Sequence, residues 1–361
     1  MIMEDISKID KNFAIETSVN KPDVVWYDVS EEPFRIYGAY SVNPYLRIPT
    51  EVAVKVNPGV EANHKYTAGI RTRFRCNSKY IALHVEWDSK LNFAHMTSIG
   101  TSGFDLYSVK DGVYEFIKPF TPPHTPSKAN NGYEGVINTS GKMTDYLLNF
   151  PCYNSVKRVF IGVSEGTEFE TAGEYKKLAP IVYYGSSITQ GGCASRPGTT
   201  YQNIIARALD IDYINLGFSG SARGERVIAE YMATLDMSVF VSDYDHNSSV
   251  EELEANHFAL YKTIREKHPN IPYVMITRPD FREGHPEDIR RKEIIKSSYE
   301  RALAEGDGNV SFIDGSVFFL GGEYWEHTVD HLHPNDLGFR KMAEGIYPTL
   351  RQVIEKSYGK I

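Results

Sequence analysis

The chain has few cysteines and no long apolar run. Its 361 residues include three cysteines, Cys76, Cys152 and Cys193, and so sparse and odd a set argues against a disulfide framework. No stretch approaches the ~20 consecutive apolar residues of a membrane span. Residues 1–18 lack the basic segment and apolar core of a signal peptide. We therefore expect a cytoplasmic protein with no membrane partner.

Excess basic charge and several well-known cofactor motifs are also missing. The net charge of −8 disfavours nucleic acid as a partner. No dinucleotide or phosphate-binding glycine loop follows a predicted strand, and the G-x-S-x-G elbow is absent because Thr189 stands where Ser187 would need a second glycine. The histidines of residues 327–333 match no zinc-site spacing. We therefore expect no cofactor and no metal.

The first part of the chain has the alternation of half-buried strands. In residues 70–76 and 81–87, apolar and polar side chains alternate with a period of two. Further strands are predicted at residues 24–28, 112–117, 143–149 and 157–163. This pattern predicts an N-terminal β-sandwich, jelly-roll-like, over residues 1–165. A polar stretch at residues 166–177 is interpreted as a linker.

The remainder, residues 178–361, has a different period. Short apolar runs alternate there with helical patterns, which predicts a parallel sheet covered by helices on both faces. The predicted strands are residues 181–184, 212–216, 238–242, 272–277 and 310–314. Because each part has its own core pattern, we expect a fragment starting near residue 174 to keep its α/β secondary structure.

One serine stands where a strand is expected to end. Residues 181–198 read IVYYGSSITQGGCASRPG, an apolar run that stops at Gly185 and places Ser187 in a polar, glycine-rich turn. Open α/β sheets bind ligands at the carboxyl ends of their strands, where turn N–H groups can face a developing oxyanion. Ser187 is therefore a candidate nucleophile, although glycine and serine also cluster at ordinary loops. Cys193 is a rival nucleophile or a packed small side chain.

An acid and a base stand together near the C-terminus. In TVDHLHPNDLGF, Asp330 and His333 are three residues apart, and Pro334 suits the first turn of a helix. The carboxylate can hold the imidazole in position while the other ring nitrogen takes a proton from serine. The alternative interpretation is an acidic surface turn before a helix.

Together these two segments resemble the SGNH, or GDSL-like, hydrolase family. The resemblance implies a flavodoxin-like three-layer sandwich with a five-stranded sheet, and assigns Ser187, His333 and Asp330 to catalysis. By the same resemblance YINLGFSG offers the Gly220 N–H to the oxyanion, beside the N–H of Ser187, and SVFVSDYDHNSS offers the Asn247 amide. The third segment departs from the family pattern.

These departures concern positions next to the predicted site. Asp245 and His246 occupy the glycine and variable positions of the family's third motif, and Ser248 occupies its final aspartate position. In the first motif Ser186 replaces an aspartate, so its shorter hydroxyl must brace the turn. The backbone around Asn247 therefore need not follow the family turn.

A second resemblance concerns the β-rich region. Residues 103–107 read G-F-D-L-Y, which is similar to the G-x-D-L-Y motif in the N-terminal β-domain of a subgroup of SGNH hydrolases. Asp105 and Tyr107 could either enter a strand or contact substrate. Trp26 and Trp87 could form a sugar-stacking face or belong to the core.

The resemblance implies a serine esterase that forms an acyl-enzyme. The expected substrate is a small molecule or oligosaccharide that carries a small O-acyl group, with acetyl the expected one. Arg196 and Arg223, in the loops after the first two motifs, are candidates for substrate binding. An acyltransferase with the same acyl-enzyme and a non-catalytic carbohydrate-binding protein remain as alternatives. The oligomeric state is left open.

Overall fold

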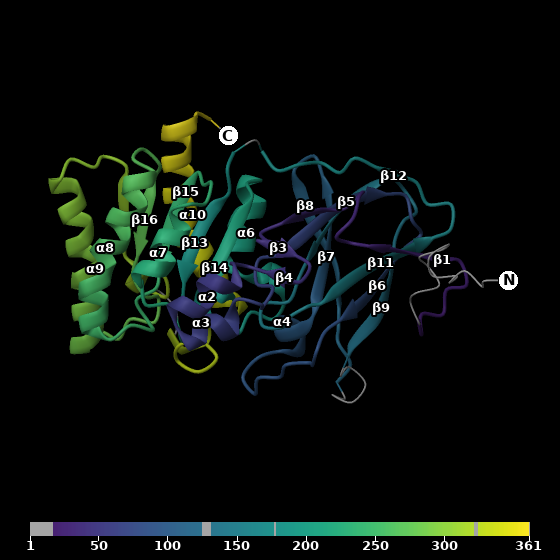
Figure 1. The fold of residues 1–361 in the computed structure, drawn as a ribbon, viewed down its shortest axis with the longest axis horizontal. Coiled ribbons are helices and arrows are strands. Elements are labelled where there is room, and N and C mark those ends of the chain that lie inside the picture. Colours follow the sequence, from purple (N-terminus) through teal and green to yellow (C-terminus); the bar gives the residue numbers. More distant parts are fainter. Residues whose placement is uncertain (1–16, 125–130, 177, 321–323, 361) are drawn as a thin grey trace.

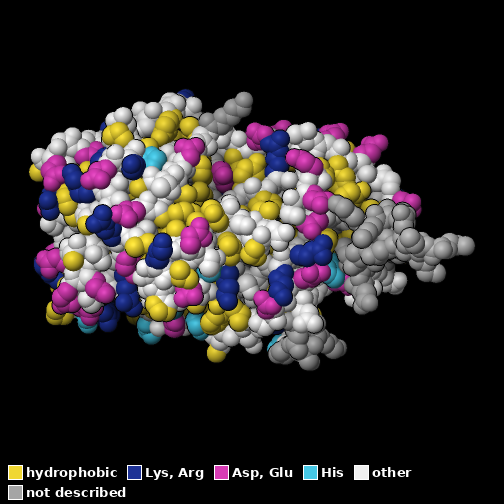
Figure 2. Space-filling model, in the orientation of Figure 1, with side chains coloured by type: hydrophobic (Ala, Val, Ile, Leu, Met, Phe, Trp, Pro, Cys, Tyr) yellow, Lys and Arg dark blue, Asp and Glu magenta, His cyan; other side chains and the backbone are white. Residues whose placement is uncertain are grey.

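The computed structural model describes residues 17–124, 131–176, 178–320 and 324–360. The expectation of a cytoplasmic location used residues 1–18, and residues 1–16 lie outside the described ranges. Figure 1 shows an α/β half and a β-rich half side by side. Among the described residues, no helix has the length and apolar character needed to cross a membrane. On the face drawn in Figure 2, basic and acidic side chains are interspersed.

The N-terminal half is a sandwich of two antiparallel sheets, as predicted. One sheet has the order β1 (Val24–Asp28), β11 (Arg158–Ser164), β6 (Tyr80–Glu86), β9 (Gly132–Asn138). The other has the order β12 (Phe169–Glu170), β5 (Arg71–Cys76), β10 (Thr144–Asn149), β7 (Phe104–Lys110), β8 (Val113–Phe120), with β2 (Arg35–Tyr37) also paired to β5. A two-stranded ribbon, β3 (Ser41–Val42) and β4 (Tyr45–Leu46), follows β2. Trp26 and Trp87 are both buried, so neither offers a free face to a sugar.

The C-terminal half has the predicted five-stranded parallel sheet. Its order is β14 (Tyr213–Gly217), β13 (Ile181–Gly185), β15 (Val239–Asp243), β16 (Tyr273–Ile276), β17 (Val310–Ile313). Alternate side chains of β13 enter opposite cores, because successive strand residues point to opposite faces. The chain order reverses beside β13, and such a switch point is where doubly wound sheets bind ligands.

Helices cover both faces of this sheet. On one face lie α6 (Tyr201–Leu209) and α10 (Asp336–Tyr358), and on the other lie α7 (Arg226–Met232), α8 (Val250–Lys267) and α9 (Pro286–Ala304). This arrangement gives the predicted three-layer α/β sandwich.

Two helices of the N-terminal half belong to the core of the C-terminal half. They are α2 (Thr50–Val56) and α3 (Pro58–Asn63), and Figure 1 shows them beside α7. Ile48, Ala53 and Val60 are fully buried in one cluster with side chains of α7, α8 and the parallel sheet. The predicted division at residues 166–177 places α2 and α3 in the first domain, but their apolar side chains pack in the core of the second. The second core is therefore not formed by residues 178–361 alone.

Candidate active site

The turn after β13 fixes the position of Ser187. The short helix α5 (Ser187–Gln190) follows Gly185 almost directly, and the Oγ of Ser186 accepts a hydrogen bond from the Ile188 N–H at 3.2 Å. A Cβ at Gly185 would lie only 2.0 Å from the Oγ1 of Thr189, so the close approach requires glycine. Ser186 thus caps the helix with its hydroxyl, and this is the bracing of the turn that was expected of it from the sequence.

The β-sandwich also holds this turn. After β10, Tyr153 donates a hydrogen bond from its hydroxyl to the backbone oxygen of Ser187 at 3.0 Å. The side chain of Gln190 donates to the carbonyl of Cys152 and accepts from the Ser219 N–H. The nucleophile turn is therefore built from both halves of the molecule.

The structure brings Ser187, His333 and Asp330 together. Ser187 Oγ lies 2.9 Å from His333 Nε2, and His333 Nδ1 lies 2.8 Å from Asp330 Oδ2. Asp330 Oδ1 also accepts the backbone N–H of His333 at 2.8 Å. Burial alone would raise the pKa of Asp330, but these hydrogen bonds outweigh it and lower that pKa. An ionised carboxylate therefore orients the ring.

Gly220 and Asn247 lie on the loops that follow the two strands flanking β13. Gly220 has a left-handed backbone (φ 69°) with open space where a Cβ would stand. The Oδ1 of Asn247 accepts the Ala222 N–H at 3.3 Å, which fixes the orientation of the amide. Among the described residues no acceptor binds its Nδ2, so this N–H can be offered to a ligand.

Two family models match the sequence of this chain. Residues 178–351 match the GDSL-like lipase/acylhydrolase family, and residues 24–169 match the G-x-D-L-Y N-terminus of SGNH-hydrolase-type esterases. Residues 178–351 belong to the GDSL-like lipase/acylhydrolase family. The predicted membership is confirmed, and this GDSL-like protein is accordingly a carboxylic ester hydrolase. A search among curated proteins found no match.

Solved structures share the two-part fold of this GDSL-like hydrolase. A Bacteroides ovatus ATCC 8483 protein described as a GDSL-like lipase is 28% identical, with a TM-score of 0.82, covering 92% of this chain and 98% of its own. A salicylyl-acyltransferase from a tetracycline biosynthetic pathway is 19% identical, with a TM-score of 0.75 and coverages of 93% and 98%. An acetyl xylan esterase from the rumen bacterium Butyrivibrio proteoclasticus is 15% identical, with a TM-score of 0.59 and coverages of 91% and 98%.

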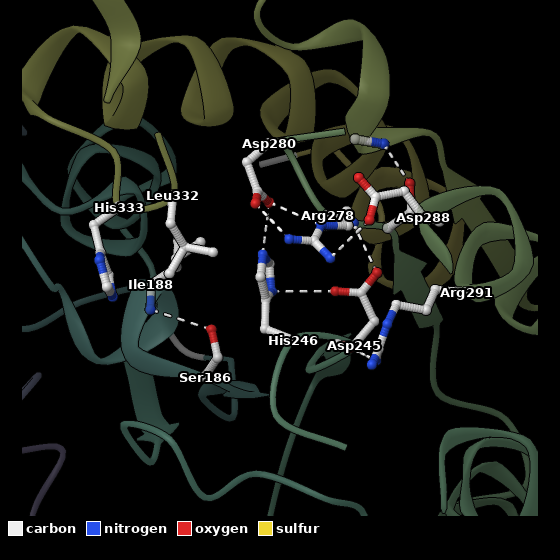
Figure 3. Close-up of polar contacts among 12 residues, drawn as sticks. Ser186, Ile188, Asp245, His246, Arg278, Asp280, Asp288, Arg291, Leu332 and His333 are labelled. Atoms are coloured by element: carbon white, nitrogen blue, oxygen red, sulfur yellow. Dashed lines mark hydrogen bonds and ion pairs between the residues drawn. The ribbon is translucent and has the colours of Figure 1, made fainter. Parts of the chain in front are cut away.

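A buried ionic network replaces the family's third motif in this hydrolase. Figure 3 shows the imidazole of His246 between the carboxylates of Asp245 and Asp280. Its Nε2 lies 2.7 Å from Asp280 and its Nδ1 3.1 Å from Asp245. Burial alone would lower the pKa of His246, but the two carboxylates outweigh it and raise that pKa to about 9. His246 is therefore a buried cation beside Asn247.

The same network clamps the backbone on both sides of Asn247. The Arg291 guanidinium donates to the carbonyls of Asp245 and Ser248, the latter at 2.8 Å. The N–H of Arg278 donates to the carboxylate of Asp245 at 3.1 Å. Sequence reasoning identified the departure from the family motif but not these partners, because no local pattern connects α9 to the end of β15.

The helices α2 and α3 support the loop that carries Gly220. Arg47, which is fully buried, donates to the carbonyls of Asn215 and Gly217 at the end of β14. Asn57 donates to the Ser221 carbonyl at 3.0 Å, and Asn63 to the Ser219 carbonyl at 3.3 Å. The predicted sites did not include these side chains, because their partners are far away in sequence.

The two arginines predicted to bind substrate have different surroundings. The Arg196 guanidinium donates to Asp105 at 2.8 Å and stacks on the ring of Phe116, so it joins the β-sandwich to the α/β half. The carboxylate of Asp105 also accepts the Gly198 N–H in the turn η3 (Pro197–Thr199). Asp105, the aspartate of the G-x-D-L-Y motif, therefore connects the two halves. The position of Arg196 in this connection gives no support to a contact with substrate.

Arg223 and Cys193 complete the set of predicted candidates. The Arg223 side chain is 44% exposed and lies 3.6 Å from Glu252, a surface ion pair that a ligand could replace. Cys193 is buried, and burial raises the pKa of its thiol to about 12, which disfavours the thiolate that a nucleophile requires.

Proposed function

We propose that this hydrolase is a serine esterase that removes a small O-acyl group, acetyl in the first instance, from a carbohydrate. The observation that carries the proposal is the unbroken relay from Ser187 Oγ through His333 to Asp330. The relay lies at the switch point of the sheet, where doubly wound folds bind ligands.

In the first step Ser187 attacks the ester carbonyl while His333 Nε2 takes the hydroxyl proton. Negative charge develops on the carbonyl oxygen, and the N–H groups of Ser187 and Gly220 and the Asn247 amide stabilise it. The leaving alkoxide receives the proton from His333, which gives the free alcohol and an acyl-enzyme. Asp330 stabilises the transient imidazolium.

In the second step a water molecule replaces the alcohol. His333 takes a proton from this water as it attacks the acyl carbonyl, and the same groups bind the oxyanion. Collapse of the intermediate returns the proton to Ser187 and releases the carboxylic acid. An acyltransferase would differ only in admitting an alcohol or sugar instead of water.

A carbohydrate as the alcohol part is supported by an exposed aromatic side chain in the segment that leads to Asp330. Trp325, which is 60% exposed, lies in the turn η5 (Tyr324–His327) on the loop that carries Asp330. Exposed tryptophan offers a flat apolar face and one N–H donor, which suits the ring face of a sugar. Carbohydrate esterases are also among the proteins that share this fold.

The test is a hydrolysis screen of acetylated model esters and acetylated sugars with the full chain and the Ser187→Ala variant. We expect turnover that the variant loses without any change in its thermal unfolding. Added alcohols, with product analysis, separate hydrolysis from acyl transfer. Equal activity in Ser187→Ala would exclude the nucleophile, and no turnover of any ester would favour a carbohydrate-binding protein.

A further inference from the structure

Three side chains with nitrogen and sulfur donors meet at the edge of the active site. They are His95, in the loop between β6 and the helix α4 (Ser98–Ser102), Cys193, just after α5, and His333. One donor atom from each lies within 4.8 Å of the others, and the two imidazole rings are 5.5 Å apart. The β-sandwich thus adds an imidazole to a site whose other two members come from the α/β half.

The donor types fit one class of metal ion. Two imidazoles and a thiol are the ligands that zinc binds in proteins, whereas magnesium and calcium require oxygen ligands. His333 is also oriented as a metal ligand is, because Asp330 lies at its Nδ1 and Nε2 points toward Ser187 Oγ at 2.9 Å, a contact that a bond to the metal would replace. A tetrahedral ion with bonds of about 2.0 to 2.3 Å needs donors roughly 3.3 to 3.8 Å apart, so a small closing movement is required.

Two further observations support a site at this place, one on His95 and one on Cys193. His95 is exposed, and neither of its ring nitrogens has a hydrogen-bond partner within the described ranges, so its ring can turn toward an ion. Cys193 has a left-handed backbone (φ 72°), which is unusual for a residue with a Cβ. This conformation places its thiol beside the catalytic imidazole, and strained residues cluster at functional sites.

We propose that His95, Cys193 and His333 bind one zinc ion, and that this ion reversibly inhibits the enzyme. Zinc would bond to Cys193 Sγ, whose proton is released to solvent, and to one ring nitrogen of each histidine. His333 Nε2 could then no longer accept the proton of Ser187. The sequence predicted no metal, so the proposed ion departs from that expectation, and it acts as an inhibitor. The inhibition rests on the proposed function of His333, whereas the binding of zinc does not.

Binding is measured directly with the full-length Ser187→Ala variant and zinc as the only added ligand. We expect one zinc per chain, with tighter binding at higher pH because a thiol proton is displaced. Cys193→Ser or His95→Gln should each weaken binding by about tenfold or more. Cobalt should give a thiolate-to-metal absorption band that Cys193→Ser removes. Cys76→Ala and His268→Gln, which change the same residue types elsewhere, should leave binding and band unchanged.

Inhibition is measured with Ser187 intact, in the native chain and in the His95→Gln and Cys193→Ser variants. The rate of each protein without zinc is its own reference. Zinc should inhibit, a chelator should restore the rate, and His95→Gln and Cys193→Ser should need about tenfold more zinc. Zinc binding that neither variant weakens would overturn the site even if the esterase is active. Specific binding in a chain that hydrolyses no ester would instead refute the proposed function and leave the zinc site standing.

Discussion

At the scale of single residues, the proposed oxyanion site relies on a donor that no acceptor within the described residues binds. The amide of Asn247 is held through its Oδ1 by the Ala222 N–H, which leaves the Nδ2 as a fixed donor. A donor that is already fixed does not have to change its orientation when negative charge develops on the carbonyl oxygen. Such a donor therefore stabilises the transition state more than the ground state. The ionic network around Asn247 provides the same rigidity for its backbone.

The first prediction concerns this donor. Asn247→Ala should lower kcat by about 10² to 10³, the usual loss for one oxyanion donor, with little effect on folding. Steady-state kinetics on a model ester measure the loss. Asn309→Ala is the matched control, because Asn309 precedes the amino end of the edge strand β17, whereas Asn247 follows the carboxyl end of β15. A decrease of less than tenfold would assign the third oxyanion donor to another group.

The second prediction concerns the charge of His246. Its pKa is 6.5 in an ordinary setting and about 9 in the fold, so the folded state binds the proton more tightly. A raised pKa adds stability that is fully present below pH 6.5 and is lost as the pH rises through 9. We therefore expect the free energy of unfolding to decrease between about pH 7 and about pH 9.5.

The measurement is denaturant unfolding at both pH values for the native chain and His246→Gln. The glutamine variant should be less stable at the lower pH and should show a smaller decrease across the interval. The buried His257 does not interfere, because burial lowers its pKa to about 4 and it titrates below this window. An equal decrease in both proteins would exclude His246 as the cause.

At the scale of elements, periodicity in the sequence was informative where an element packs by its own pattern. All five strands of the parallel sheet lie within a few residues of the predicted runs, because strands covered on both faces are mostly apolar. Helices α2 and α3 were not predicted. Each is only six or seven residues long, and such helices form because of tertiary packing rather than local propensity.

The third prediction tests whether α3 supports the Gly220 loop. Asn57 caps α3 with its Oδ1 and holds the Ser221 carbonyl with its Nδ2. Serine is an equally good cap but has no amide to reach Ser221. Asn57→Ser should therefore lower kcat, by up to about 10²-fold for a displacement near 1 Å, while stability decreases by only about 1 kcal/mol.

Kinetics and thermal unfolding together give the answer. The matched control is Asn77→Ser, because Asn77 also accepts a backbone N–H and donates to a glutamate, as Asn57 does to Glu225, but within the β-sandwich. A loss of stability without any loss of kcat in Asn57→Ser would show that the helix is merely structural.

At the scale of the whole molecule, the two halves are interlocked rather than joined by a linker. The buried segment of Ile48, Ala53 and Val60 completes the second core, and the side chain of Arg47 satisfies carbonyls at the end of β14. Each large apolar side chain buried there contributes about 1.5 to 3 kcal/mol. A domain has only about 5 to 15 kcal/mol of net stability, so losing the whole segment removes a large part of it.

The last prediction therefore reverses the expectation from the sequence. A fragment of residues 174–361 should aggregate or unfold without cooperativity, and should not hydrolyse even a small activated ester, because its apolar surface beneath α2 and α3 would be exposed. A second fragment, with residues 45–66 fused to it through a flexible linker, restores the missing side chains and should unfold cooperatively in denaturant. If the first fragment unfolds as sharply as the second and has equal activity, the interlocked segment is not needed to form the second core.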